Sequence, residues 1–455
     1  MTMTPSSARL QDPGIRALFE RNSRWQSWLD VEAALAQAQA RIGMIPTTSA
    51  TIITATAHLH LLDEKRIVDG LARTGHPLVP LVWELARACG EEAGGQVHWG
   101  ATTQNILETG DALLLKKTLS IYRQQFARLF SAMADLAERT ADTPVTGRTN
   151  GQQALPVTFG FKVAAWIDEF SRHLKRINDL SPRVLVATLG GAVGTFASFG
   201  AQGPALQTEF AQTLQLGVTP VPSRTHLDRA AEYITCLGLI AGTTGKIAKE
   251  IYTLCKQEFG EAGEPVPEGA VGSSTMPQKR NPVMVQDLMA DSVAVRALVP
   301  QALESMLVEH EADRTSSLVM RNAIANGSAL TGDSLERLII TLEGLWVDPQ
   351  RMLNNLGLTG GMILSESIML ELGKVIGRQE AHDVVYDAAQ AVLDGTTSFA
   401  NALTQAPLVK AHLSAEAVHA MLDPTGYTGL SGDIAREQAE VARCLARDLS
   451  SASHQ

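Results

Sequence analysis

One run of eleven residues carries the strongest chemical signal in the sequence: Gly272-Ser273-Ser274-Thr275-Met276-Pro277-Gln278-Lys279-Arg280-Asn281-Pro282. A Gly/Pro/Glu-rich stretch, 258–269, precedes it, and an apolar segment with helical spacing begins near Val283. A polar segment between a loop and a long helix is typical of an active-site lid. A solvated interhelical loop would explain the Gly/Ser part, but not the cation and the amide that follow between two prolines. We therefore expect this run to line an active site.

Long helices are predicted on both sides of this run. Apolar residues recur at helical spacing over five long segments, 111–140, 156–179, 227–259, 283–306 and 322–345. An earlier helix is expected between Pro13 and Gly43, and almost no segment shows the alternation of a strand. Such lengths imply an elongated helical bundle. The sequence thus predicts an all-α fold with three helical domains, 1–110, 111–348 and 349–455.

Composition narrows the class of protein. The chain has 455 residues and a net charge of −10, without a basic run, so a nucleic-acid partner is not expected. The four cysteines form no CxxC pair and predict reduced thiols. No apolar run reaches transmembrane length, and the N-terminus lacks a signal-peptide core. These features predict a soluble cytoplasmic protein without a membrane partner.

Subunit association is expected from one helix in particular. This helix has little polar surface, which is typical of a helix buried on nearly every face, as is shown by Leu237, Gly238, Leu239, Ile240, Ala241, Ile247 and Ala248. In an elongated bundle, association with further copies is the natural way to bury such a helix. We therefore expect a homo-oligomer.

The eleven-residue run resembles the signature loop of the fumarase/aspartase superfamily, GSSxMPxKxNP. Further motifs follow in the order found in adenylosuccinate lyases and in 3-carboxy-cis,cis-muconate cycloisomerases: Arg24-Trp25-Gln26, His98-Trp-Gly-Ala-Thr-Thr-Gln, Gly147-Arg-Thr, Gly191-Ala-Val-Gly-Thr, Asp228-Arg229 and His310-Glu311. The later Leu422-Asp-Pro is similar to the cycloisomerase branch. The resemblance covers nearly the whole chain.

The resemblance implies a fold, an assembly and a chemistry. The fold is the fumarase/aspartase fold, in which a homotetramer forms a central bundle of twenty helices. Each active site is built from three segments of three different subunits. The shared chemistry removes a proton from the carbon next to a carboxylate, through an aci-carboxylate intermediate, on a small polycarboxylate and without a cofactor. No Cys/His or carboxylate cluster in the sequence has metal-ligand spacing, so no metal is expected.

The same resemblance assigns roles to individual residues. Ser273 matches the base, although a serine hydroxyl needs backbone N–H groups and a cation to stabilise its alkoxide. The dianion formed on deprotonation needs dense positive and N–H compensation. The residues expected to bind the substrate are Thr102, Thr103, Gln104, Arg148, Thr149, Ser274, Met276, Lys279, Asn281 and Arg321. For Thr102 or Thr103 a simple helix N-cap is the structural alternative, and a helix N-terminus is itself an anion site.

The proton donor is where this sequence departs from the pattern. Adenylosuccinate lyases carry a histidine after Gly-Arg-Thr, whereas this chain has Asn150. An amide cannot donate a proton at neutral pH, but it can hydrogen-bond a carboxylate or an imine nitrogen. His76, in a Gly-His-Pro turn, falls where adenylosuccinate lyases have another active-site histidine. His76 is thus either a structural turn residue or the acid that Asn150 cannot be.

We expect from this departure a net isomerisation: cycloisomerisation of a carboxymuconate, or epimerisation of an N-substituted aspartate such as iminodisuccinate. The alternative is a C–N lyase of the adenylosuccinate type, with His76 as acid and fumarate as product. A non-enzymatic relative, like the crystallins of this superfamily, is disfavoured because Ser273, Lys279 and Asn281 are all present.

Overall fold

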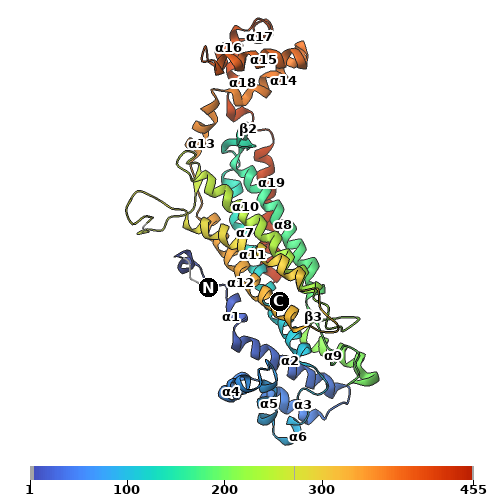
Figure 1. Cartoon of the computed structure of the whole chain (residues 1–455). Helices are drawn as coiled ribbons and strands as arrows, with labels where there is room; N and C mark the ends of the chain where they lie inside the picture. The colour runs from blue at the N-terminus through green and yellow to red at the C-terminus, as the bar shows by residue number, and fades with distance from the viewer. Residues whose placement is uncertain (1–4, 271, 453–455) are drawn as a thin grey trace.

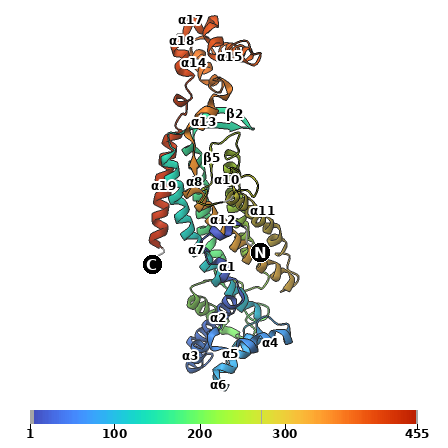
Figure 2. The same cartoon turned by 90° about the vertical axis from the view of Figure 1, so that its left-hand side faces the viewer.

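The protein is an elongated, almost wholly helical body, seen from two sides in Figures 1 and 2. The computed structural model describes residues 5–270 and 272–452. The N-terminal helices form one end, long helices run through the middle, and a group of short helices forms the other end. The predicted all-α class is confirmed.

The N-terminal end consists of short helices around α2, together with α9 from later in the chain. Their bounds are α1 Ile15–Leu18, α2 Arg21–Arg41, α3 Thr47–Thr56, α4 Glu64–Thr74, α5 Val79–Cys89, α6 Glu91–Gly94 and α9 Gly203–Leu214. Apart from Ile15 of α1, which belongs to the central core, their buried apolar residues form a hydrophobic cluster of their own. The single helix expected between Pro13 and Gly43 is broken between α1 and α2, at Phe19 and Glu20.

Six long helices form the central bundle. They are α7 Thr103–Arg139, α8 Phe159–Val184, α10 Asp228–Leu254, α11 Val283–Glu304, α12 Arg314–Glu343 and α19 Ser431–Ala452. The core between them contains large buried side chains such as Tyr122, Phe126 and Phe170. The helix α19 comes from the C-terminal part of the sequence, and its alanines, including Ala439 and Ala442, lie in this central core.

The remaining short helices form the far end, around a third hydrophobic cluster. They are α14 Ser365–Ile376, α15 Arg378–Leu393, α16 Phe399–Gln405, α17 Pro407–His412 and α18 Ala415–Met421, whereas α13 Pro349–Leu356 contributes Met352 to the central core. The helix α13 lies beside the β1–β2 hairpin, below this group (Figure 1). The division into domains at 110 and 348 stays a prediction.

The strands are short and paired two by two. The antiparallel hairpin joins β1 Pro144–Thr149 to β2 Gln152–Thr158; β3 Val186–Ala187 pairs with β4 Gly217–Val218 in parallel, and β5 Ala262–Gly263 with β6 Trp346–Val347 antiparallel. The hairpin turn is Asn150-Gly151, with φ of 51° and 78°. Positive φ at both central residues is what a type I′ turn requires, and Asn-Gly is its favoured sequence.

Helix bounds differ from the predicted ones mainly at two N-termini, where α7 and α12 each begin about eight residues early. In both cases a polar side chain caps the first turn. The amide N–H of Thr102 donates to Asn105 Oδ1 over 3.1 Å, and Asp313 accepts from the Thr315 amide over 2.8 Å. Capping of this kind satisfies backbone donors that have no partner inside the helix, so it extends the helix beyond its apolar stripe. No helix in the described part of the chain is long and apolar enough to cross a membrane.

Candidate functional site

The residues predicted for the active site lie in three places on one chain. Thr103 is the first residue of α7, and the β1–β2 hairpin with Asn150 follows the last residue of the same helix. A helix of 37 residues rises about 55 Å at 1.5 Å per residue. The segment before α11, which contains Ser273, projects from the side of the bundle (Figure 1). A single chain therefore does not bring Thr103 and Asn150 to one small substrate.

At the N-terminal end of α7 the structure brings His76 to the predicted threonines. His76 Nε2 lies 3.4 Å from Thr103 Oγ1. On the other side of the ring, Nδ1 accepts the backbone N–H groups of Leu78 and Val79, over 3.3 and 3.0 Å. Two donors aimed at Nδ1 leave the ring proton on Nε2, where it faces Thr103. His76 is thus arranged as a neutral hydrogen-bond donor.

The electrostatics around His76 agree with a neutral ring. Burial lowers the pKa of His76, and the nearby positive charges of His98 and Arg314 lower it further. At neutral pH the imidazolium form is therefore a minor one. His76 could supply a proton as an acid only at the cost of the two hydrogen bonds to Nδ1.

A second histidine, His98, is a site candidate that the sequence-based reasoning did not single out. Its Nδ1 lies 2.6 Å from Oε1 of Glu32, a buried carboxylate on α2, and its φ is 60°. Burial by itself would lower the pKa of His98, but the charge and hydrogen bond of Glu32 outweigh it, so the pKa is raised. A left-handed backbone at a residue other than glycine marks a strained position. The local signal was the His98-Trp99-Gly100 motif; the partner on α2 is 66 residues away.

Gln104 is fully engaged within the chain. Its Nε2 donates to Glu108 Oε1 and, over 2.8 Å, to the carbonyl of Arg224, while its Oε1 accepts from Arg224 Nε over 2.8 Å. The side chain is buried. Gln104 thus fixes the segment before α10 against the start of α7. Its predicted contact with substrate stays a prediction.

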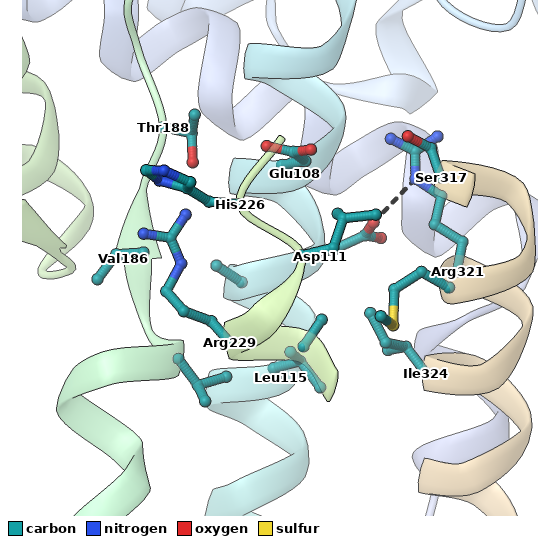
Figure 3. Close-up of a pocket in the computed structure, with 15 residues that line it drawn as sticks. Glu108, Asp111, Leu115, Val186, Thr188, His226, Arg229, Ser317, Arg321 and Ile324 are labelled. Carbon is teal, nitrogen blue, oxygen red and sulfur yellow. Dashed lines mark hydrogen bonds and ion pairs between the residues drawn. The ribbon is translucent and has the colours of Figure 1, made fainter. Parts of the chain in front are cut away.

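Arg321 lies on α12, and its guanidinium is paired with the carboxylate of Asp111. Its Nε lies 3.1 Å from Asp111 Oδ2, and Arg24 Nη1 lies 3.3 Å from Asp111 Oδ1. Asp111 and Arg321 line a cleft between α7, α10 and α12 that is partly open to solvent (Figure 3). Within it, burial raises the pKa of Glu108 to about 7, against the hydrogen bond from Gln104 and the charge of Arg321.

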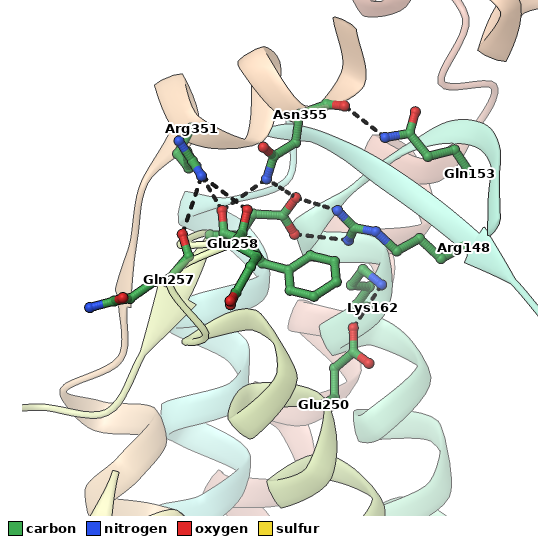
Figure 4. A network of polar contacts seen from close by, with 10 residues as sticks. Arg148, Gln153, Lys162, Glu250, Gln257, Glu258, Arg351 and Asn355 are labelled. Atoms are coloured by element: carbon green, nitrogen blue, oxygen red, sulfur yellow. Dashed lines mark hydrogen bonds and ion pairs between the residues drawn. The ribbon is translucent and has the colours of Figure 1, made fainter. Parts of the chain in front are cut away.

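At the other end of α7, Arg148 is anchored in a network of polar contacts (Figure 4). Its guanidinium forms two bonds with Glu261, of 2.9 and 2.5 Å, and lies 4.9 Å from the ring centre of Phe259. Asn355 Nδ2 donates to the same carboxylate over 2.7 Å, and Gln153 Nε2 donates to the Asn355 carbonyl over 2.7 Å. The network joins the hairpin, the root of the signature loop and α13. Arg148 is thus held as a structural pair, and its predicted contact with substrate stays a prediction.

The tip of the hairpin is different, because Thr149 and Asn150 are exposed. A register shift between Gly147 and Arg148 marks a bulge in β1. Bulges re-aim the side chains that follow them. Here the bulge lies between the anchored part of the hairpin and its free tip.

In the signature loop, two backbone N–H groups point at the hydroxyl oxygen of Ser273. It accepts the backbone N–H groups of Thr275 and Met276, over 3.3 and 3.1 Å. Two N–H donors on one oxygen stabilise negative charge there. The backbone geometry therefore suits an alkoxide at Ser273, as the sequence-based reasoning expected.

The loop is closed by contacts across its base. Asn281 Nδ2 donates to the Gly272 carbonyl over 2.6 Å, and a Cβ at Gly272 would come within 2.0 Å of the Lys279 carbonyl oxygen. Glycine is therefore the residue that fits at 272. The Lys279 ammonium is exposed and pairs with no carboxylate in the described ranges 5–270 and 272–452. Ser274 and Met276 are also exposed. The loop thus carries an unpaired cation and a hydroxyl that accepts two backbone N–H groups.

The structure places these groups without bringing them together in one chain. A donor-rich hydroxyl, a free ammonium, an exposed amide and a threonine-histidine pair are the groups needed to remove a proton and hold a carboxylate. Among the described residues, no cluster of three or more His, Cys, Asp or Glu side chains could hold a metal ion.

The chain is similar to known protein families and to individual enzymes. A family model described as "Lyase" matches residues 9–297, and one described as "Adenylosuccinate lyase C-terminus" matches residues 361–437. The chain is 37% identical over 417 residues to N-acetyl-S-(2-succino)cysteine lyase of Dickeya dadantii, with 92% of each chain covered. It is 38% identical over 435 residues to 3-carboxy-cis,cis-muconate cycloisomerase of Pseudomonas aeruginosa, covering 95% of this chain and 94% of that one. The structure of the 3-carboxy-cis,cis-muconate lactonizing enzyme of Pseudomonas putida superposes with a TM-score of 0.88 at 32% identity, covering 98% and 99% of the two chains.

Proposed function

The chain belongs to the fumarase/aspartase superfamily and is an isomerase or lyase, and from this premise we propose that it isomerises a small polycarboxylate without a cofactor. Ser273 removes the proton next to a carboxylate, and an aci-carboxylate forms. The observation that carries the proposal is the pair of backbone N–H groups on the Ser273 hydroxyl oxygen.

The base must overcome two difficulties. A serine hydroxyl is a weak base, and the carbon acid beside a carboxylate is very weak. Two N–H donors lower the energy of the alkoxide, and the unpaired Lys279 ammonium can compensate the second charge that the substrate carboxylate gains in the aci form. Thr102 and Thr103, at the N-terminus of a long helix, suit a second carboxylate.

A complete site needs more than one subunit. Because α7 separates Thr103 from Asn150 by about 55 Å, the segments that meet at one substrate come from neighbouring chains. Apolar side chains on the outer faces of the bundle support association: Leu239 on α10 is 49% exposed, and Val293 and Leu303 on α11 are 59% and 51% exposed. We therefore assign a homotetramer with a twenty-helix core, in which three subunits contribute to each site.

The choice of isomerisation follows from the groups that could donate a proton. The Asn150 amide cannot donate one at neutral pH, and the His76 ring is neutral with Nδ1 occupied. Expulsion of an amine usually needs an acid, whereas a carboxylate leaves as a stable anion and needs none. Opening or closing of a lactone on a carboxymuconate expels or adds a carboxylate and so avoids that requirement. Epimerisation of iminodisuccinate breaks no C–N bond: Ser273 takes the α-proton from one face, and water supplies a proton to the opposite face.

The second candidate is a lyase that releases fumarate from an N- or S-succinyl compound. Its specific support is the 37% identity to a relative named N-acetyl-S-(2-succino)cysteine lyase. A thiolate is also a leaving group that departs without strong acid assistance. For an amine leaving group, the His98 imidazolium beside Glu32 is a better source of a proton than His76.

The two candidates are separated by following the α-proton and the product. The wild-type enzyme is incubated in deuterated buffer with iminodisuccinate, and deuterium at the α-carbon is followed by NMR. Carboxymuconate loss and fumarate formation from S-succinyl and N-succinyl substrates are followed by ultraviolet absorbance. We expect exchange or carboxymuconate loss without fumarate. Fumarate formation from a succinyl compound, with neither of the other signals, would replace the isomerase by the lyase.

A further inference from the structure

The cleft beside Asp111 is built from one face of α7, the start of α10 and the start of α12. Figure 3 shows His226 and Arg229 on one wall, Glu108 and Asp111 in the middle, and Arg321 on the opposite wall. Its floor is apolar, formed by side chains such as Leu115, Val184, Met320 and Ile324. A few charged side chains above an apolar floor are the mixed lining that is typical of a small-molecule site.

Most of the charges in the cleft are already satisfied. Asp111 binds both Arg24 and Arg321, and Glu108 accepts from Gln104. In contrast, the side chains of His226 and Arg229 form no hydrogen bond or ion pair with any other residue in the parts of the chain that the structure describes. Partly buried guanidinium groups normally have a partner, because burying a charge without one is costly. The open partner position on this wall suits an anion.

The cleft adjoins the predicted substrate segment. Gln104 follows Thr103 in the first turn of α7, and its side chain donates to Glu108 one turn further along. Gln104 also binds the backbone and the guanidinium of Arg224, which precedes the wall formed by His226 and Arg229. A substrate held at Thr102 and Thr103 therefore has the cleft as its neighbour on α7.

We propose that this cleft is a second carboxylate subsite, in which Arg229 and His226 bind a carboxylate on the part of the substrate that does not react, while the apolar floor holds its carbon chain. The inference rests on the proposed function, and it narrows the substrate to a compound with a further carboxylate beyond the two at the reacting end. One guanidinium and one imidazole match a single carboxylate better than the dianion of a phosphate ester, because Arg321 and Arg24 are shared with Asp111.

Glu108 makes this binding depend on pH. Its burial raises its pKa to about 7, against the Gln104 hydrogen bond and the charges of Arg321 on α12 and Arg229 on α10; Asp111 raises it further. His226 faces the same space from the segment before α10. Above that pKa the Glu108 carboxylate repels a bound anion. We therefore expect carboxylate binding to weaken as pH rises from 6 to 8 and the Glu108→Gln variant to lose most of this dependence. Retention of the full dependence in Glu108→Gln would remove Glu108 from the subsite.

The direct test is calorimetric binding to the catalytically silenced Ser273→Ala enzyme. The probes are tricarballylate, which has three carboxylates, and succinate, which has two. Adding Arg229→Gln should weaken tricarballylate binding by about 10- to 100-fold, the range for a lost hydrogen bond to a charged group, and should leave succinate within about twofold. Arg229→Lys should recover part of the loss. The control is Arg378→Gln, because Arg378 is an exposed arginine at the start of α15.

The possible results of the binding test bear on two points, the existence of the subsite and the chemistry of its ligand. An equal loss for both probes, or no loss for either, would overturn the subsite. Tighter binding of inorganic phosphate than of tricarballylate, abolished by Arg229→Gln, would overturn the assignment to a carboxylate. Circular dichroism and the oligomeric mass of each variant show whether it has folded. The assay needs no turnover, so the subsite can fail while Ser273-dependent chemistry stands, or stand while that chemistry fails.

Discussion

At the N-terminal end of α7 the polar side chains are bound to one another, whereas at its C-terminal end the hairpin tip is exposed. Gln104 has every polar atom engaged inside the chain, and His76 has both ring nitrogens near partners. At the other end Arg148 is anchored in its network with Glu261, whereas Asn150 faces solvent. We call the N-terminal end of α7, with Gln104 and His76, the wall. We call the β1–β2 hairpin the arm; Arg148 holds its root, and Asn150 lies at its exposed tip.

The difference follows from what each end is built to meet. A wall that receives a small polar molecule gains from rigidity, because its groups do not have to be ordered on binding. An arm that completes a site on another subunit needs an exposed tip and a firm base. The signature loop follows the second pattern, since Lys279 is exposed while Asn281 and Gly272 close its base. If the two ends serve one reaction, substitutions at either end should impair the same turnover.

The largest effect is expected from Ser273→Ala. Loss of the general base should lower kcat by about a thousandfold or more, within the range for such groups. The measurement is α-proton exchange in deuterated buffer with iminodisuccinate. Thr275→Ala is the matched control, because it keeps the backbone N–H that binds the Ser273 oxygen. Exchange at the full rate in Ser273→Ala would place the base elsewhere and would leave the exposed loop without its role.

The next effect concerns the separation of the two ends. If Ser273 and Thr103 act in one site but come from different subunits, the inactive variants Ser273→Ala and Thr103→Val should complement each other. Mixed tetramers, formed by co-expression, should recover a measurable fraction of wild-type turnover, because some sites contain neither substitution. Mixtures of Ser273→Ala with itself are the control. Inactive mixed tetramers of confirmed composition would mean that both residues come from one chain.

The third prediction concerns the root of the arm. Arg148→Met leaves Glu261, which is 0% exposed, with its charge unpaired. Removing one partner of a buried ion pair costs about 3–5 kcal/mol, and we expect that loss in urea unfolding. The control is Arg436→Gln, which breaks an exposed pair with Asp142 and should cost no more than about 1 kcal/mol. Equal losses in the two variants would mean that the hairpin is not held by this network.

Much of the fold could be predicted from the sequence, because it depends on local patterns. The helical spacing of apolar residues predicted five of the long helices, and the start of α11 at Val283 matches the predicted residue. The starts of α7 and α12 were predicted about eight residues too late, and the long helix α19 was not predicted. The β1–β2 hairpin was missed, although its Asn150-Gly151 turn is a strong local signal. The hairpin turn lies between the predicted helices 111–140 and 156–179. The Asn150-Gly151 pair indicates the turn type, but the residues on either side of it do not alternate clearly between apolar and polar.

The site could be predicted only in part, because its partners are far apart in sequence. The signature loop identified Ser273, and the local backbone supports that prediction. In contrast, Arg148 meets Glu261 113 residues later, and Gln104 meets Arg224 120 residues later. Such pairings form only in the packed bundle, so no local sequence pattern predicts them. His98 is a further example, because its pKa is raised by the charge and the hydrogen bond of Glu32, a residue on another helix.

The smallest effect is expected from the two histidines at the wall end, whose titrations have opposite signs. The pKa of His76 is lowered in the folded protein, so its protonation disfavours the native state, and stability should fall as pH drops below about 6.5, the ordinary pKa of histidine. The pKa of His98 is raised, so its pairing with Glu32 stabilises the protein below about 6.5 and is lost as pH rises through the raised value. The measurement is the urea midpoint between pH 5.5 and 8 for wild type, His76→Asn and His98→Asn. An asparagine at 76 can still accept the Leu78 and Val79 N–H groups, so that variant should lose less stability in acid than wild type. A steeper acid loss in His76→Asn would contradict the neutral, Nε2-protonated ring and would reopen His76 as the acid of a lyase.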